Sequence, residues 1–412
     1  MVMMASKMQE QECGDGTSLV LALAGELLTQ AEILIKMGLH PSQILLGYEA
    51  ASTKVVELLE NVQALKLQDI RDQVEVSKCL TACISSKLHD YAPHFTQLVA
   101  KACIQCTPKD PSNFDTQSVR ICKIQGGNPL DSLVMQGLIV SRSSECQINR
   151  CDKPKIAIYG CALDTQVTDE KTTVLLTNAE DLKKYTRGEE DHCEEVVKAI
   201  ADSGCTAIIL GGSISEIMKH YVEKYKIMIV KVLSKFELRR LAKALSARII
   251  TKLGAPTAEE FGCCDSIVVE EVGSQKITRF YNNSENCNYS TVILRGNTKN
   301  TLDDIERAID DGVNVFSQMA RDGTFCPGAG ATEIVLAAQL EEFASKIKGL
   351  DQYSYNNFAR AFEVIPRILA DNAGLNSNEI ISSMYALNGK DKGFFGLDIE
   401  VSYPHFTRVS PV

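Results

Sequence analysis

The sequence lacks several features that mark common classes of protein. It contains no run of 18 apolar residues; the most apolar early segment, residues 19–28, is interrupted by Glu26 and is too short to cross a bilayer. The N-terminus has no basic segment followed by an apolar core, so no secretory signal is expected. The net charge of −10 and the absence of a long basic run argue against nucleic-acid binding. We therefore expect no membrane and no nucleic acid among its partners.

The usual signatures of catalysis are also scarce. The six histidines are isolated from one another, and the sequence has no GxxxxGK[ST] phosphate loop. A small phosphotransferase that uses a different glycine loop stays open as an alternative class. The fifteen cysteines are scattered along 412 residues, which indicates free thiols in a reducing cytoplasm rather than a disulfide scaffold. Zinc is the alternative to core thiols for four of them: Cys79, Cys83, Cys103 and Cys106.

The hydrophobic pattern divides the chain into helical, α/β and again helical regions. Helical periodicity dominates the first hundred or so residues, with helices expected over 19–38, 42–62, 68–88 and 94–106. Short apolar runs then alternate with helical segments up to about residue 296, which is typical of a mainly parallel sheet. Helices return over 301–319, 331–347 and 355–374. The two helical ends are predicted to form one domain into which the α/β part is inserted.

Residues 14–18, GDGTS, form a glycine-rich segment directly before an expected helix. In one interpretation its backbone amides and the positive helix end bind a phosphate, and Asp15 holds Mg²⁺. In the other, the segment is an ordinary turn with Asp15 or Thr17 as the helix cap. The segment alone does not decide between the two.

Two further segments allow the same pair of interpretations. Residues 327–333, PGAGATE, again place small residues before a helix, either for close approach of a nucleotide or for tight packing. Asp310 and Asp311 are adjacent in an acidic helix and therefore cannot share one helix face. One of them can face a site and orient a water molecule while the other is solvated; the alternative is an exposed acidic face.

Taken in order, GDGTS, TVILRGNT, DDIERAIDDGVNVF and PGAGATE resemble the motifs of the group II chaperonins. The resemblance extends over about residues 3–400. Within that family, the family of theta subunits of the eukaryotic cytosolic complex is the most similar, through MASKMQEQECGDGTS, SVRICKI, DEKTTVLLTNAEDL, GEED, SKFELRRL, DDIERAIDDGVN, PGAGATEI and GLDIE.

The resemblance implies a multidomain α and α/β fold. A discontinuous helical equatorial domain would comprise residues 1–63 and 327–412, and an intermediate hinge domain residues 64–140 and 291–326. The apical α/β domain, which binds substrate, would comprise residues 141–290. Its segment 164–195 lies where the family carries a helical lid.

The resemblance also implies roles for single residues. Asp15 matches the aspartate that binds Mg²⁺, and Asp311 matches the catalytic aspartate that positions water. The phosphate loop corresponds to Gly14, Gly16, Thr17 and Ser18, although the family commonly has Thr at the last of these positions, and the glycines near the ribose correspond to Gly328 and Gly330.

The expected helix over residues 234–247 lies where the family binds unfolded polypeptides. Its spacing predicts Ser234 as the cap and an exposed face that carries the substrate-binding residues Lys235, Arg239 and Arg240. The apolar residues Phe236, Leu238 and Leu241 are expected nearer the domain body.

The function implied by the resemblance is that of an ATP-dependent chaperone subunit in a hetero-oligomeric double ring. Its cofactors would be ATP and Mg²⁺, its partners other chaperonin subunits and non-native polypeptides, and its location the cytoplasm. The sequence departs from the family in having no Gly-Pro-x-Gly loop before GDGTS and in diverging after GLDIE. We therefore expect a subunit shortened at both ends that binds ATP weakly or not at all. The alternative function is a polypeptide-binding or partner-binding module without ATPase activity.

Overall fold

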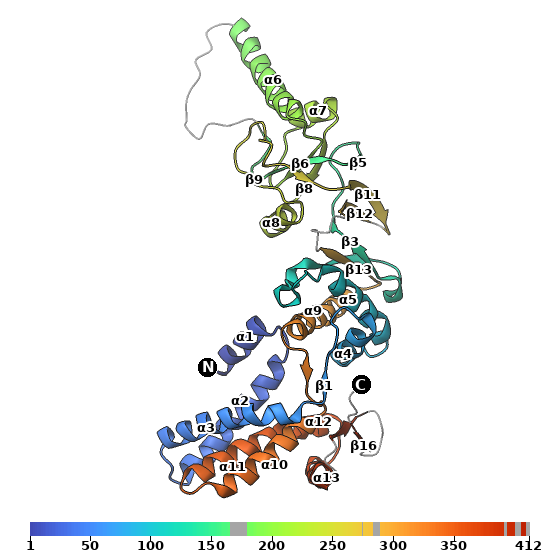
Figure 1. Cartoon of the computed structure of the whole chain (residues 1–412). Coiled ribbons are helices and arrows are strands. Elements are labelled where there is room, and N and C mark those ends of the chain that lie inside the picture. Colours follow the sequence, from blue (N-terminus) through green and yellow to red (C-terminus); the bar gives the residue numbers. More distant parts are fainter. Residues whose placement is uncertain (165–178, 274, 283–288, 391–393, 400–404, 409–412) are drawn as a thin grey trace. The chain divides into compact units, whose positions relative to one another are not determined.

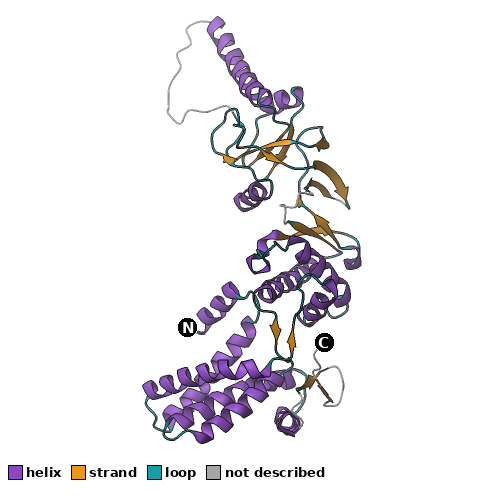
Figure 2. Ribbon diagram, in the orientation of Figure 1, coloured by secondary structure: helices purple, strands orange, loops and turns teal. Residues whose placement is uncertain are grey.

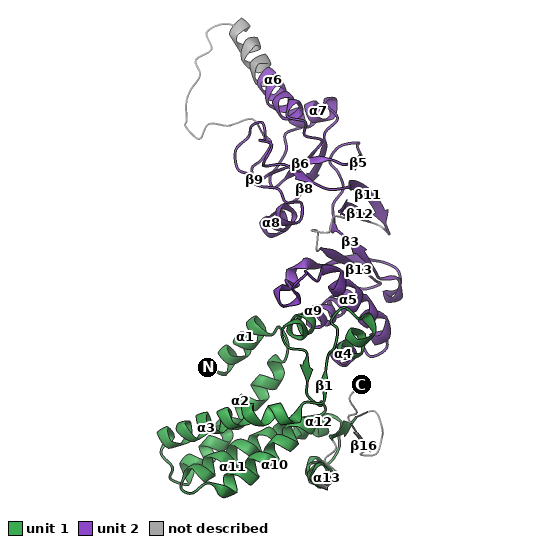
Figure 3. Cartoon of the chain, viewed as in Figure 1, with its two compact units in different colours: residues 1–80, 314–412 green, residues 81–313 purple. Residues whose placement is uncertain are grey.

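The computed structural model describes residues 1–412 except 165–178, 274, 283–288, 391–393, 400–404 and 409–412 (Figure 1). The chain separates into two compact units, residues 1–80 with 314–412 and residues 81–313 (Figure 3). One unit is mainly helical and the other contains most of the strands, which confirms the predicted mixture of α and α/β parts (Figure 2). The finer division into equatorial, intermediate and apical segments stays a prediction.

The first unit is built from helices at the two ends of the chain. These are α1 (Val2–Glu12), α2 (Thr17–Lys36), α3 (Pro41–Leu59), α10 (Ala331–Lys346), α11 (Asp351–Phe362), α12 (Val364–Asn372) and α13 (Ser377–Lys390). Helix α11 packs against α2, α3 and α10. The shared core includes Ala51, Val55, Leu340 and Phe358. Two short antiparallel pairs complete the unit: β1 (Leu65–Lys66) with β14 (Thr324–Phe325), and β15 (Phe395–Asp398) with β16 (His405–Arg408).

Helix α2 exposes several of its apolar side chains. By length and composition it is the one helix in the described part of the chain that is long and apolar enough to cross a membrane. Leu34 is its one buried residue, and Leu28 and Ile35 are exposed. Together with α1 and α3 it lines an apolar groove of about 450 Å³.

The second unit contains a five-stranded sheet with helices on both faces. The strands are β6 (Lys155–Tyr159), β7 (Ala207–Leu210), β8 (Met228–Lys231), β9 (Ile249–Ile250) and β10 (Gly262–Cys263). The order is β10-β6-β7-β8 with β9 also paired to β6, and every pairing except β10 with β6 is parallel. Because side chains alternate along a strand, Ile156 and Ile158 face one core and Ala157 and Tyr159 the other. Helix α8 (Lys235–Ala244) covers the first face, and α6 (Ala179–Asp202) and α7 (Glu216–Lys224) cover the second.

Two smaller sheets lie in the same unit. The antiparallel order β4-β12-β11-β5 joins β4 (Leu138–Val140), β12 (Gln275–Tyr281), β11 (Ser266–Val272) and β5 (Arg150–Asp152). The order β2-β13-β3 joins β2 (Val119–Gln125), β13 (Ser290–Gly296) and β3 (Leu133–Gln136). Strand β13 pairs with β2 in parallel, from Ser290 opposite Val119. Helix α5 (Ala92–Cys106) packs against this sheet. Helices α4 (Gln73–Ser85) and α9 (Lys299–Arg321) each contribute residues to both units.

The structure differs from the expected helices in several places, among them α13 (Ser377–Lys390), which was not predicted. The single helix predicted over residues 355–374 is divided at Glu363 into α11 and α12. Pro366 accounts for the division, because its nitrogen carries no hydrogen and its ring clashes with the carbonyl group four residues earlier. Residues 2–12 form α1, which was not predicted; none of its residues is buried, so it has no clear apolar stripe.

Candidate functional site

Residues 14–16 lie between α1 and α2, Thr17 and Ser18 begin α2, and the start of this helix has no side-chain cap. The cap residue is Gly16, which has a left-handed backbone with φ of 79°. Neither Asp15 nor Thr17 is the cap residue, contrary to the turn interpretation. The Asp15 carboxylate instead accepts a hydrogen bond from the Gly16 N–H, with Oδ1 and N 2.7 Å apart. The N–H groups in the first turn of α2, together with the positive end of the helix, can therefore bind an anion.

Gly14 is required by close packing within the first unit. Its φ is 76°, and a Cβ atom at this position would lie 2.3 Å from Cγ of Asn314 in α9. Nearby, the Gln318 side-chain amide donates to the Glu12 carbonyl group, with 2.9 Å between the two atoms. Any larger residue at position 14 would therefore displace the loop from the C-terminal part of α9.

Residues 327–333 repeat this arrangement at the start of α10. Gly330 is the cap residue with φ of 80° and no side-chain cap, and Ala329 is also left-handed, with φ of 56°. The Thr332 hydroxyl donates to the Pro327 carbonyl oxygen at 2.6 Å and closes the loop. Position 330 has no room for a side chain, because a Cβ atom there would lie 2.9 Å from Cβ of Pro366. A Cβ atom at Gly328 would meet nothing within 4 Å among the described residues, so this position is open to approach.

Glu333 introduces an unpaired carboxylate oxygen into the first turn of α10. Its Oε2 is buried and has no hydrogen-bond partner among the residues that the structure describes. Burial raises the pKa of Glu333. The positive end of the helix offsets part of the cost of this charge.

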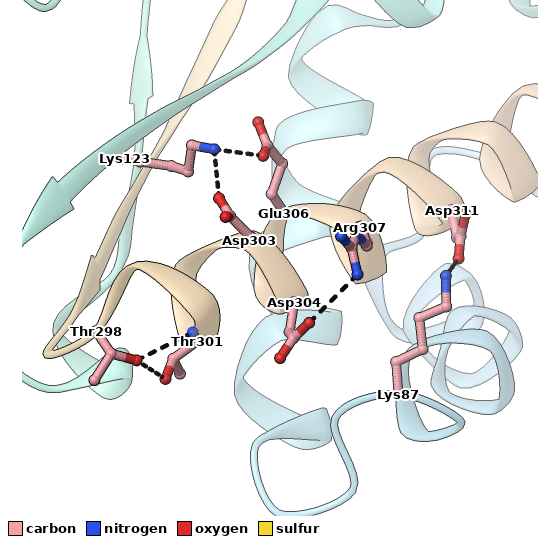
Figure 4. A network of polar contacts seen from close by, with 9 residues as sticks. All are labelled: Lys87, Lys123, Thr298, Thr301, Asp303, Asp304, Glu306, Arg307 and Asp311. Atoms are coloured by element: carbon pink, nitrogen blue, oxygen red, sulfur yellow. Dashed lines mark hydrogen bonds and ion pairs between the residues drawn. The ribbon is translucent and has the colours of Figure 1, made fainter.

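In the second unit, the Asp311 carboxylate forms an ion pair with Lys87, which follows α4 (Figure 4). The Asp311 side chain is 17% exposed, whereas Asp310 is exposed. The two adjacent carboxylates thus have different surroundings, as the helix geometry predicted. A carboxylate held in one orientation can accept a hydrogen bond from a water molecule.

The first half of α9 is tied to strand β2 by a second group of charges (Figure 4). The Lys123 ammonium group contacts Asp303 at 2.8 Å and Glu306 at 2.7 Å. Hydrogen bonds to these two carboxylates raise the pKa of Lys123, and the hydrogen bond from Lys123 lowers the pKa of Asp303. These contacts hold α9 against the three-stranded sheet.

Helix α8 has the predicted cap, but two of its side chains, Arg240 and Phe236, differ in exposure from the prediction. Ser234 accepts a hydrogen bond from the Glu237 N–H, as expected. Lys235 and Arg239 are exposed, and Arg240 is half-buried.

The expectation that Phe236 lies near the domain body is wrong, because its side chain is 67% exposed. Leu238 and Leu241 are buried, as predicted. Position 236 is about 200° around the helix from position 238, so the two side chains lie on opposite faces.

The cysteines do not form a metal site in the described part of the chain, where no cluster of three or more metal-binding side chains occurs. Cys103 and Cys106 are buried in α5. Burial raises the pKa of the Cys103 thiol. The described cysteines are free thiols.

The predicted site residues are distributed over both units. Residues 14–18, 328 and 330 belong to the first unit, and Asp311 and the α8 residues belong to the second. Sequence reasoning missed Lys87 and Asn314. Lys87 lies in no recognisable motif, and a single lysine after a helix has many ordinary roles. Asn314 lies within DDIERAIDDGVNVF, but the motif does not show that its side chain contacts the loop at Gly14.

The loops fit a magnesium nucleotide in their local chemistry. Helices α2 and α10 each begin after a left-handed glycine and have no side-chain cap. Their first backbone N–H groups can therefore donate hydrogen bonds to phosphate groups. Asp15 supplies a carboxylate oxygen of the kind that Mg²⁺ prefers.

Comparison with known proteins gives a consistent result. Residues 1–405 match the TCP-1/cpn60 chaperonin family. T-complex protein 1 subunit theta of Dictyostelium discoideum is 46% identical over 404 residues, which are 98% of this chain and 75% of that protein. The human theta subunit is 42% identical, over 98% of this chain and 74% of that protein. Among solved structures, the open-state monomer of a group II chaperonin from Methanococcoides burtonii has a TM-score of 0.73 and 27% identity, with 96% of this chain and 92% of that chain covered.

Proposed function

Because the chain belongs to the TCP-1/cpn60 chaperonin family, we propose that it works as an ATP-dependent chaperone subunit of a hetero-oligomeric ring in the cytoplasm. The observation that carries this function is similarity to theta subunits along 97–98% of the chain. Its partners are other chaperonin subunits and non-native polypeptides.

Residues of the first unit bind the nucleotide in this proposal. Gly14 and Gly16 allow the phosphates to approach the backbone, the first-turn amides of α2 and the hydroxyl groups of Thr17 and Ser18 donate hydrogen bonds to them, and Asp15 binds Mg²⁺. Gly328 leaves the backbone open to the sugar, and Gly330 gives the same loop its left-handed turn into α10. When bound, ATP supplies the phosphoanhydride bond whose hydrolysis drives the folding cycle.

Asp311 is the proposed catalytic residue. Its carboxylate accepts a hydrogen bond from the attacking water, and the ion pair with Lys87 keeps the carboxylate in one orientation. Lys87 is thus a positioning residue.

Helix α8 is the proposed polypeptide-binding element. Lys235 and Arg239 are exposed and offer charge, and Arg240 is half-buried at the edge of the same helix. The exposed Phe236 adds an apolar contact. A binding module without ATPase activity is not favoured as the function, because Asp15 and Asp311 are both present in a chain that matches its family from residue 1 to 405. The expectation that this chain binds ATP weakly or not at all stays a prediction, which the nucleotide assays measure.

Co-purification from cells together with nucleotide assays tests this function. A tagged chain should elute with other chaperonin subunits in a large complex. Asp15→Ala should abolish Mg-ATP binding at this subunit. Asp311→Asn should keep binding and stop hydrolysis.

The matched control is Asp304→Asn, which removes an exposed carboxylate of the same helix. It should leave binding, hydrolysis and assembly unchanged. Elution as a free chain, or Mg-ATP binding by Asp15→Ala equal to that of the wild type, would contradict the proposal.

A further inference from the structure

A cleft of about 240 Å³ lies in the second unit between the inner side of α8 and strands β2 and β4. Arg120, Cys122 and Lys123 contribute to it from β2, and Glu237 and Arg240 contribute from α8. Its apolar lining includes Leu241. None of the nucleotide candidates lines this cleft.

Arg120 and Arg240 are two cations without a hydrogen bond or ion pair in the described part of the chain. Both are half-buried. Burial and the neighbouring positive charge of Arg240 lower the pKa of Arg120. The two guanidinium groups therefore repel one another in a place where water screens them only partly.

The carboxylates around the cleft offset part of this positive charge, but none is paired with either guanidinium group in the described part of the chain. Lys123 is already bound to the carboxylates of Asp303 and Glu306. Glu237 lines the cleft, and Asp310 and Glu306 of α9 also act on Arg120. None of these three carboxylates forms an ion pair with Arg120 or Arg240 among the described residues, so two guanidinium groups and one unpaired carboxylate line the space.

The size of the cleft indicates what it can hold. Pockets for complete small-molecule ligands usually have about 300–1,000 Å³, so this cleft suits a single side chain better. A planar carboxylate matches the donor geometry of guanidinium groups. The apolar lining accommodates the methylene stem of an acidic side chain.

We propose that this cleft binds the carboxylate of an aspartate or glutamate side chain from a polypeptide held on α8, between Arg120 and Arg240. The proposal rests on the proposed function in assigning α8 to polypeptide binding, and it adds a second, inner site to the exposed face of that helix. A bound carboxylate neutralises the repulsion between the two guanidinium groups. Polypeptides with an acidic residue beside an apolar one are thus selected.

Fluorescence anisotropy with the full chain and two labelled peptides tests the proposal. The peptides are identical except that one has Glu where the other has Gln. The Glu peptide should bind about tenfold more tightly, as expected for a charge-assisted contact. Arg120→Gln and Arg240→Gln should each remove most of this preference, and added salt should weaken it.

Arg307→Gln is the matched control, since Arg307 is an exposed arginine of α9 outside the cleft. It should keep the full preference. Thermal unfolding of each variant shows whether the fold is intact, and Arg120→Lys, which keeps the charge, should retain part of the preference if Arg120→Gln unfolds.

Three outcomes would overturn the inference. These are equal binding of the two peptides, an unchanged preference in Arg120→Gln, and inorganic phosphate that binds more tightly than the Glu peptide, which would assign the cleft to a free oxyanion. The assay contains neither nucleotide nor ring partners. A chain that binds the Glu peptide selectively but does not assemble would therefore count against the proposed function and not against the cleft.

Discussion

Lys87 and Asp311 lie 224 positions apart in the sequence and form an ion pair in the second unit. The pair connects the turn after α4 with the middle of α9. It also fixes the carboxylate that we propose as the catalytic group. In the proposed function, loss of this contact should therefore lower the activity of the subunit.

Replacing Lys87 with Met should reduce ATP hydrolysis more than Mg-ATP binding, because Asp311 loses its orientation. The free energy of unfolding should fall by only about 0.5–1 kcal/mol, since the Lys87 side chain is 43% exposed. Urea titration and steady-state kinetics measure the two effects. Lys87→Arg should restore part of the hydrolysis, and a variant with normal hydrolysis would show that Lys87 has no positioning role.

The two glycines before α10 should respond differently to substitution by alanine. Gly330→Ala should lower stability by about 1–3 kcal/mol, because the backbone is left-handed and the new Cβ atom would press on Pro366. Gly328→Ala is the control and should change stability by less than about 1 kcal/mol, since its Cβ atom meets nothing nearby. Thermal unfolding compares the stability of the two variants. Equal losses of stability would mean that Pro366 moves to make room for a side chain at position 330.

Glu333→Gln should stabilise the chain at neutral pH by about 1 kcal/mol, because it removes a buried charge with an unpaired oxygen. The pKa of Glu333 is raised in the folded state, so the folded chain binds more protons than the unfolded chain above the ordinary carboxyl pKa. The stability of the wild type should therefore fall as pH rises through the raised pKa. The variant should lack this part of the pH dependence.

Urea titrations between pH 4 and pH 8 measure the effect. Glu342→Gln is the control, because the hydrogen bond from Lys346 lowers the pKa of this exposed carboxylate. It should give no stabilisation. A Glu333→Gln curve parallel to that of the wild type would show that Glu333 finds a partner in solution.

Two substitutions in α8 separate packing from polypeptide binding. Leu241→Ala removes a buried side chain from the core and should cost about 2–4 kcal/mol. Phe236→Ala should cost less than about 0.5 kcal/mol, because its ring is exposed, yet it should weaken capture of an unfolded test protein. Urea titration measures stability, and light scattering by an aggregating test protein measures capture. If Phe236 were a core residue, Phe236→Ala would lower stability strongly and leave capture unchanged.

Features that depend on local pattern could be predicted from the sequence. Strands β6, β7 and β8 are short continuous apolar runs, because a parallel sheet covered on both faces buries every side chain. Ser234 was identified as a cap from the residues that follow it. The division at Pro366 could also have been found, since proline carries its own helix-breaking signal.

Features that depend on tertiary contact could not be predicted in the same way. The glycines of residues 14–18 indicate an anion loop, but only packing shows that Asn314 excludes a side chain at Gly14. Lys87, the ion-pair partner of Asp311, is distant from it in the sequence. The helical pattern around Lys87 would be the same without this ion pair, so it gives no sign of the contact. The face of Phe236, by contrast, could have been predicted, because position 236 lies about 200° around α8 from the buried Leu238.

The pairing of β2 with β13 has a consequence for the order in which this protein forms as it is synthesised. Val119 leaves the ribosome long before Ser290, its partner in the sheet; at about 5–20 residues per second the delay is on the order of ten seconds or more. Helices α2 and α3 wait longer still for α11, against which both pack. Throughout this interval the apolar side chains of α2 and α3 have no native partner from the other end of the chain. We therefore expect the nascent chain to expose apolar surface of the kind that chaperones bind until its last helices emerge.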